Sequence, residues 1–145
     1  MEIHTIGFTQ KSARAFFESL RQKGIERLVD VRINNTSQLA AFAKRDDLRY
    51  FLDEILGAEY VHEPLLAPTR ELLKAYRDGE IDWDGYERAF LDLMAERRIE
   101  EVIPKEFFGK RTVLLCSEAV PEKCHRRLVV EYLDRAWGNV EAIHL

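Results

Sequence analysis

The run Thr112-Val113-Leu114-Leu115-Cys116 is the most apolar stretch of this chain. A strand of a parallel sheet that is covered on both faces has a continuous apolar sequence of this kind, whereas a strand with one face in water alternates apolar and polar residues. We therefore expect residues 112–116 to form a buried central strand around which the rest of the fold is arranged.

Shorter β-rich runs alternate with helical patterns on both sides of this strand. They predict further strands at residues 3–6, 27–31, 59–62 and 140–144. Apolar residues at helical spacing predict helices at about residues 12–24, 46–57, 69–78, 82–94 and 121–138. Because parallel neighbours need crossovers, this order predicts a single α/β domain over residues 1–145: a mostly parallel sheet of about five strands, helices on both faces, and a helical insertion before the central strand.

Composition narrows the function classes. The 145 residues are 46% hydrophobic and 33% charged, with 7 Gly and 4 Pro, which excludes a disordered or low-complexity chain. The formal net charge of -4 gives no overall attraction to nucleic acid or to an anionic membrane, so an anion site must be local. Without a signal-like or membrane-spanning apolar run, we expect a cytoplasmic protein that does not bind membranes.

Polar residues follow several of the predicted strands at one edge of the sheet. Ligands of parallel α/β sheets bind beyond the carboxyl ends of the strands. The residues expected at this rim are Gly7 and Thr9 after the first strand, Arg32 and Asn34 after the second, His62 at the end of the third, and Cys116 and Glu118 at the end of the central strand. We expect Gly7, Thr9, Arg32 and Asn34 to contribute to an anion-binding site and His62 to line it.

The segment of residues 116–127, CSEAVPEKCHRR, places two thiols, an imidazole and two guanidinium groups around a predicted helix start. The amides and dipole at a helix N-terminus favour anions, so we expect a lowered pKa for Cys124 and a bound anion clamped by Arg126 or Arg127. Seven intervening residues also predict that Cys116 and Cys124 lie close together. The simpler alternative is that both cysteines are structural and the arginines are solvated.

Asp30 and Arg32 are two residues apart and share one face of the second predicted strand. A carboxylate in an apolar strand needs a partner, so we expect the two side chains to be organised together. They either contact the substrate or form a structural ion pair that tethers the following loop.

Together these motifs resemble the uncharacterised family catalogued as domain of unknown function 488. The resemblance covers nearly the whole chain: Thr5-Ile6-Gly7, Asp30-Val31-Arg32, Tyr60-Val61-His62, the aromatic helix after residues 78–83, and residues 114–118 leading to Cys124-His125-Arg126. It implies a small cytoplasmic α/β protein with a site at the Cys…Cys-His-Arg signature and names no reaction. Phe8 replaces a usual His or Tyr, and Leu66-Ala67 replaces a usual Gly-Gly.

The leading interpretation is a protein that binds a small anionic or nucleotide-like ligand at the rim, with thiol-based catalysis. Its candidate nucleophiles are Cys116 and Cys124, its candidate proton carriers Glu118 and His125, and its anion clamps Arg32 and Arg126. We expect no metal and no cofactor, because adjacent Cys124 and His125 should point to different sides of a helix. The alternatives are a reversible disulfide, a Cys/His metal site with His62 as a fourth ligand, and a non-catalytic module for anions or nucleic acid.

Overall fold

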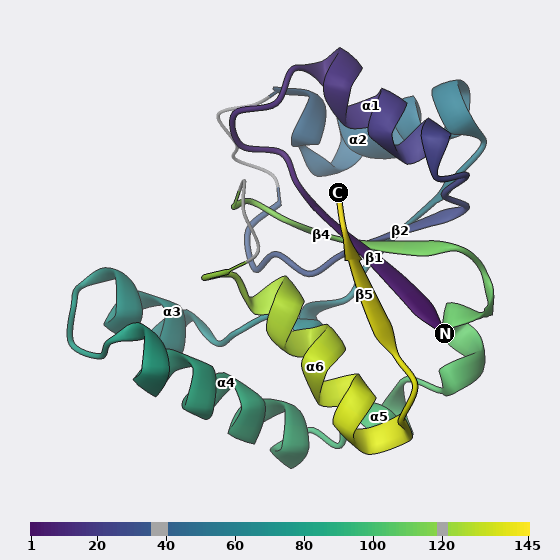
Figure 1. The fold of residues 1–145 in the computed structure, drawn as a ribbon. Coiled ribbons are helices and arrows are strands. Elements are labelled where there is room, and N and C mark those ends of the chain that lie inside the picture. Colours follow the sequence, from purple (N-terminus) through teal and green to yellow (C-terminus); the bar gives the residue numbers. More distant parts are fainter. Residues whose placement is uncertain (36–40, 119–121) are drawn as a thin grey trace.

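The computed structural model describes residues 1–35, 41–118 and 122–145 and shows a single α/β domain. Its five strands are β1 (Glu2–Gly7), β2 (Arg27–Asp30), β3 (Glu59–His62), β4 (Thr112–Cys116) and β5 (Glu141–His144). They form one sheet in the order β3-β2-β4-β1-β5, and every neighbouring pair is parallel (Figure 1). The predicted fold class is confirmed.

Strand β4 is the central strand, as its apolar sequence predicts. It pairs with β2 on one side and β1 on the other, and all five of its residues are buried. Successive side chains point to opposite faces: Leu114 packs into one hydrophobic cluster, whereas Val113 and Leu115 pack into the other. Continuous apolar sequence is required here because both faces are covered.

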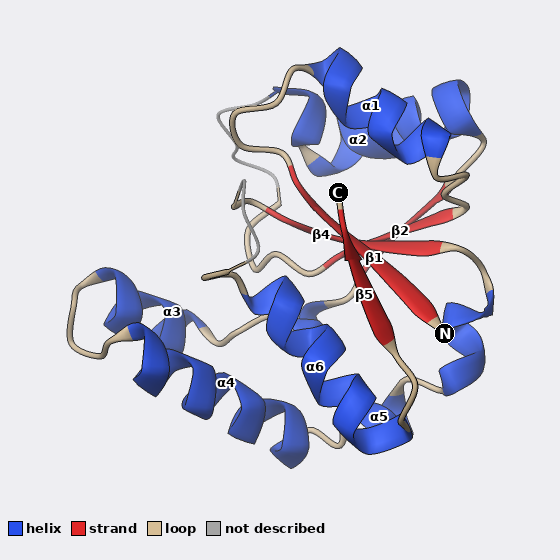
Figure 2. Cartoon of the chain, viewed as in Figure 1, coloured by secondary structure: helices blue, strands red, loops and turns tan. Residues whose placement is uncertain are grey.

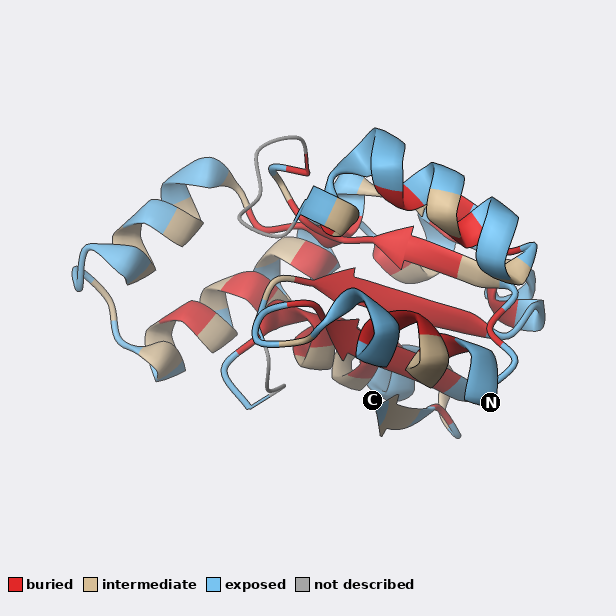
Figure 3. Cartoon of the chain, turned by 90° about the horizontal axis from the view of Figure 1, so that it is seen from above, coloured by how far each residue is buried: buried red, intermediate tan, exposed pale blue. Residues whose placement is uncertain are grey.

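Helices cover both faces of the sheet. Figure 2 shows α1 (Ala13–Gln22) and α2 (Arg45–Phe51) on one side, and α3 (Arg70–Arg77), α4 (Trp83–Glu96), α5 (Ile99–Val102) and α6 (His125–Trp137) on the other. The helices turn their exposed residues outward, and β1, β2 and β4 are largely buried between the layers, whereas the edge strands β3 and β5 are more exposed (Figure 3). No helix in the described residues is long and apolar enough to cross a membrane.

Local capping explains why several helices begin where the sequence predicts. The side chains of Ser12, Thr69 and Asp82 each accept a hydrogen bond from a backbone N–H in the first turn of α1, α3 and α4. Gly79, at φ +76°, follows the last turn of α3, in a conformation that glycine adopts without strain.

The helical stretch expected over residues 46–57 is confirmed and consists of α2 followed by a π-helical turn at Leu52–Leu56. One predicted boundary was wrong. The last helix, expected to start near Pro121, begins at His125 with Cys124 as its N-cap, and Pro121 lies outside the described residues. The sequence analysis also missed α5 and the short 3₁₀ turns at Ala41–Ala43, Pro64–Leu66 and Lys105–Gly109, which are too short to show an apolar period.

Candidate functional site

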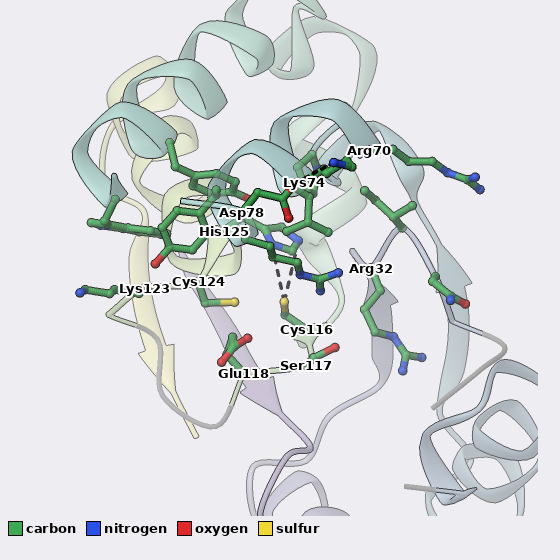
Figure 4. Close-up of a pocket in the computed structure, with 18 of the residues that line it drawn as sticks. Arg32, Arg70, Lys74, Asp78, Cys116, Ser117, Glu118, Lys123, Cys124 and His125 are labelled. Carbon is green, nitrogen blue, oxygen red and sulfur yellow. Dashed lines mark hydrogen bonds and ion pairs between the residues drawn. The ribbon is translucent and has the colours of Figure 1, made fainter. Parts of the chain in front are cut away.

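A cavity of about 880 Å³ opens at the carboxyl ends of β2 and β4, next to α3, α4 and the start of α6 (Figure 4). This is the rim at which a parallel sheet was expected to bind ligands. Its charged lining residues are Arg32, Arg70, Lys74, Arg77 and Lys123, with Asp78 and Glu118 as the acids. Cations therefore outnumber carboxylates five to two among the described lining residues, although the chain as a whole carries a net charge of -4.

Three of these cations come from α3, a helix that was not expected to contribute to the site. Arg70, Lys74 and Arg77 lie on α3 and all line the cavity. Their spacing of four and then three residues places them on one face of the helix, which is the signal that could have revealed them. Lys74 is paired with Asp78 at 2.6 Å.

Cys116 ends β4 at the cavity wall and contacts the imidazole of His125. Its Sγ lies 3.6 Å from His125 Nδ1, while Nε2 of the same ring lies 2.7 Å from the carbonyl oxygen of Val31. A carbonyl only accepts hydrogen bonds, so Nε2 carries a proton. Nδ1 is thereby left to exchange a proton with the thiol of Cys116.

Cys124 completes a compact cluster with these two residues. The sulfurs of Cys116 and Cys124 and a ring nitrogen of His125 all lie within 4.8 Å of one another, which confirms the predicted proximity of the cysteines. The expectation that Cys124 and His125 point apart was wrong. Cys124 has the extended backbone of an N-cap (φ -139°, ψ 138°), so its side chain does not follow the helical rotation that begins at His125.

The two thiols differ in acidity. A hydrogen bond from Cys124 lowers the pKa of Cys116, as do backbone N–H groups of Glu118 and Ser117 and the charge of Arg126, although burial opposes them. The pKa of Cys124 is raised, because its own S–H donates to Cys116 and because it is buried. The expectation of a lowered pKa at Cys124 was therefore wrong, and Cys116 is the thiol that ionises more readily.

Arg126, Gly7 and Thr9, which were expected to bind the anion, are not among the described lining residues of the cavity, and they contact the loop after β4 instead. Arg126 is 0% exposed, and its guanidinium donates to the Glu118 carbonyl at 2.5 Å, to Thr5 Oγ1 at 3.4 Å and to Cys124 Sγ at 3.7 Å. Thr9 donates to the carbonyl of Ser117 through both its backbone N–H and its hydroxyl. These contacts hold the backbone that places Cys116.

Asp30 and Arg32 form the buried ion pair that their spacing predicts. Arg32 donates to both oxygens of Asp30, at 2.8 and 2.7 Å, and to the carbonyl of Ala43 at 2.8 Å, and Tyr60 donates to Asp30 at 2.6 Å. Arg32 also lines the cavity, and its buried Nη1 has no hydrogen-bond partner among the described residues. The ion pair is tied to the chain beyond the loop after β2 through Ala43, and within the described residues one donor group of Arg32 has no partner.

Of the two remaining residues predicted at the rim, Asn34 and His62, one lines the cavity and the other is not in its described lining. Asn34 lines the cavity. His62 does not belong to the described lining, because its Nε2 is hydrogen-bonded to the carbonyl oxygen of Arg32 at 2.9 Å. It is held beside the loop after β2 and lies outside the Cys116, Cys124 and His125 cluster.

Comparison with known proteins places the chain by family. A family model described as "Domain of unknown function DUF488" matches residues 12–133. The chain belongs to the DUF488 family. This confirms the resemblance carried by the sequence motifs. No match was found among curated proteins or among solved structures.

The three clustered side chains of this DUF488 protein are also of the types that hold a soft metal ion. Two ligands of a tetrahedral zinc ion, one sulfur and one nitrogen, lie about 3.6 Å apart, which is the separation of Cys116 Sγ and His125 Nδ1. The guanidinium of Arg126 lies 3.7 Å from the sulfur of Cys124, where its positive charge would repel a bound metal cation.

We predict that the protein purified without added metal contains no stoichiometric zinc, because the hydrogen bond that Cys124 donates to Cys116 and the burial of its side chain raise its pKa and keep the thiol protonated. Elemental analysis is the measurement, with thermal unfolding in the presence and absence of a chelator as its companion. One zinc per chain, together with a lower melting temperature on chelation, would contradict this prediction.

Gly7 provides a test of the loop support. A Cβ at this position would overlap the carbonyl oxygen of Glu118, so we predict that Gly7→Ala lowers the free energy of unfolding by about 3 kcal/mol. Gly109→Ala is the matched control, since its Cβ would meet nothing within 4 Å, and it should change stability by less than about 0.5 kcal/mol. Urea unfolding measures both, and equal effects would show that the contact between Gly7 and Glu118 is not tight.

Proposed function

We propose that this DUF488 protein binds a small anionic ligand in the cavity beyond β2 and β4 and that Cys116 acts on that ligand as a nucleophile. The observation that carries the proposal is the position of Cys116, whose sulfur contacts the imidazole of His125, in the wall of a cavity where cations outnumber carboxylates among the described lining residues. Positive charge in a partly enclosed site concentrates anions there even when the whole chain is negative.

The contacts of Cys116 and His125 indicate the role of each residue in such a reaction. The thiol of Cys116 gives its proton to Nδ1 of His125, and the carbonyl of Val31 holds the ring in the tautomer that can receive it. Sγ then forms a bond to an electrophilic atom of the ligand. The leaving group departs with the electron pair and takes the proton back from Nδ1, while Arg32, Arg70 and Lys74 hold the ligand's negative charge.

Among the residues considered as nucleophile and proton carrier, the geometry favours Cys116 over Cys124 and His125 over Glu118. His125 has a contact with the nucleophilic sulfur, whereas the backbone of Glu118 is engaged with Cys116 and Arg126 and its side chain faces the cavity. Glu118 remains a candidate for a proton exchange with the ligand itself.

The nucleic-acid alternative receives less support. The basic residues that could together contact nucleic acid are Lys110, Arg111, Lys123, Arg126 and Arg127. Lys110 and Arg111 precede β4 and bond to Glu59 and to the Lys23 carbonyl, whereas Lys123 lines the cavity beyond the other end of that strand. Since Arg126 is buried as well, these residues do not form one surface.

We predict that Arg70→Ala and Lys74→Ala each weaken binding of pyrophosphate, the probe anion, about three- to tenfold, because each removes one exposed cation from the cavity lining. Isothermal titration calorimetry measures the affinities. Arg88→Ala, which removes an exposed cation that does not line the cavity, is the matched control and should leave affinity unchanged. Equal affinities in all four proteins would mean that the cavity is not the anion site.

We further predict that Cys116 is alkylated by iodoacetamide with a midpoint pH below that of an ordinary cysteine. The reaction rate rises with pH as the thiolate forms, and the hydrogen bond from Cys124 lowers the pKa that sets the midpoint. Cys124→Ala removes this donor and should raise the midpoint, whereas Cys124→Ser retains a hydroxyl donor and should change it little. Peptide mass spectrometry measures the alkylation rate of Cys116 at each pH. Identical midpoints in the two variants would show that the hydrogen bond from Cys124 does not lower the pKa of Cys116.

A further inference from the structure

We propose that Cys116 and Cys124 are a dithiol–disulfide couple that reduces anionic low-molecular-weight disulfides, with Cys124 resolving the adduct formed on Cys116. The inference rests on the proposed function, because it uses Cys116 as the nucleophile in the same cavity. It adds a second reacting residue, a redox reaction and a chemical class of substrate.

The geometry brings the two sulfurs within reach of each other. They are the only cysteines in the sequence, both are free, and their sulfurs lie within 4.8 Å. A disulfide needs a separation of about 2.05 Å, so the side chains must approach further. No capping hydrogen bond to the start of α6 has to be broken for the side chain of Cys124 to turn toward Cys116.

The surroundings of Cys124 explain why it reacts second. In the free protein its S–H donates to Cys116, so Cys124 holds its proton while Cys116 ionises. Once Cys116 is bonded to a ligand sulfur, it carries no negative charge, and the two influences of Cys116 that raise the pKa of Cys124 are lost. Arg126, with Nη1 3.7 Å from Cys124 Sγ, and His125 remain to favour the Cys124 thiolate.

The reaction balances as a thiol–disulfide exchange. The Cys116 thiolate attacks one sulfur of a disulfide R–S–S–R, forms a mixed disulfide, and releases the first thiolate R–S⁻. Cys124 loses its proton and attacks Sγ of Cys116, so the Cys116–Cys124 bond forms and the second R–S⁻ leaves. Two protein thiols are oxidised, one disulfide is reduced, and the two released thiolates take up the protons that the cysteines gave up.

The cavity indicates the substrate class. Its volume of about 880 Å³ is within the range that accommodates a short peptide or a molecule of similar size. The cations of α3 and Lys123 favour groups such as carboxylates on the molecule that carries the disulfide. A second thiol this close to a nucleophilic cysteine can also displace the adduct on Cys116 when that adduct is a mixed disulfide.

The test uses oxidised glutathione, an anionic peptide disulfide, with the reduced wild-type chain, Cys116→Ser and Cys124→Ser. After incubation at neutral pH, free thiols are alkylated and intact masses are measured. We expect the wild type to lose two hydrogens and resist alkylation, Cys124→Ser to accumulate one glutathione on Cys116, and Cys116→Ser to remain unmodified and open to alkylation. Circular dichroism verifies that both variants are folded.

Different outcomes separate the inference from the proposed function. If the wild type stops at the mixed disulfide just as Cys124→Ser does, Cys124 does not resolve it and the inference is wrong, while Cys116 remains a nucleophile. If Cys116 stays unmodified in both the wild type and Cys124→Ser, its proposed role as nucleophile fails along with the inference.

The substrate class is tested by comparing oxidised glutathione with cystamine, a cationic disulfide. We expect the wild type to react at least tenfold faster with oxidised glutathione, and Lys74→Ala to reduce this preference, whereas the control Arg88→Ala preserves it. A preference for cystamine, or a ratio that Lys74→Ala leaves unchanged, would overturn the assignment to anionic disulfides.

Discussion

Burial of β4 on both faces, between parallel neighbours on both sides, is the constraint on which the rest of the structure depends. It requires the apolar run, and it fixes Cys116 at the carboxyl end of the sheet next to the ends of β1 and β2. The chain leaves this strand in a confined space, where Glu118 passes so close to β1 that only a glycine fits at position 7. Arg126 and Thr9 bond the same loop, so the backbone around Cys116 is held by several independent contacts.

Two opposing effects act on the buried thiols. Removing a thiolate from water raises its free energy, and burial alone would keep both cysteines protonated. At Cys116 this penalty is offset by hydrogen bonds from Cys124 and from two backbone amides, together with the charge of Arg126. Cys124 receives less help and acts as a donor. Since both cysteines are buried, the difference in their acidity comes from the larger number of hydrogen bonds that the sulfur of Cys116 accepts and from the one that Cys124 donates to it.

The charge of the cavity lining differs in sign from the net charge of the whole chain. The net charge is negative, yet α3, Arg32 and Lys123 give the cavity a local excess of cations. In the proposed function this local excess of cations attracts small anions into the cavity, while the negative net charge gives no general attraction to a long polyanion. The buried pair of Asp30 and Arg32 contributes to both stability and the site, because its two hydrogen bonds fix the guanidinium while Nη1 keeps no partner among the described residues.

The sequence by itself determined the α/β class, the central position of residues 112–116, the helix starts at Ser12, Thr69 and Asp82, and the pairing of Asp30 with Arg32. These features depend on periodicity, capping and short spacings, which are local properties of the chain. Only the tertiary structure decided that Cys116 is the more acidic thiol, that Arg126 lies beneath the site, and that α3 supplies its cations. The reason is physical: acidity, burial and cavity shape arise from contacts between segments far apart in sequence, and no local pattern encodes those distances.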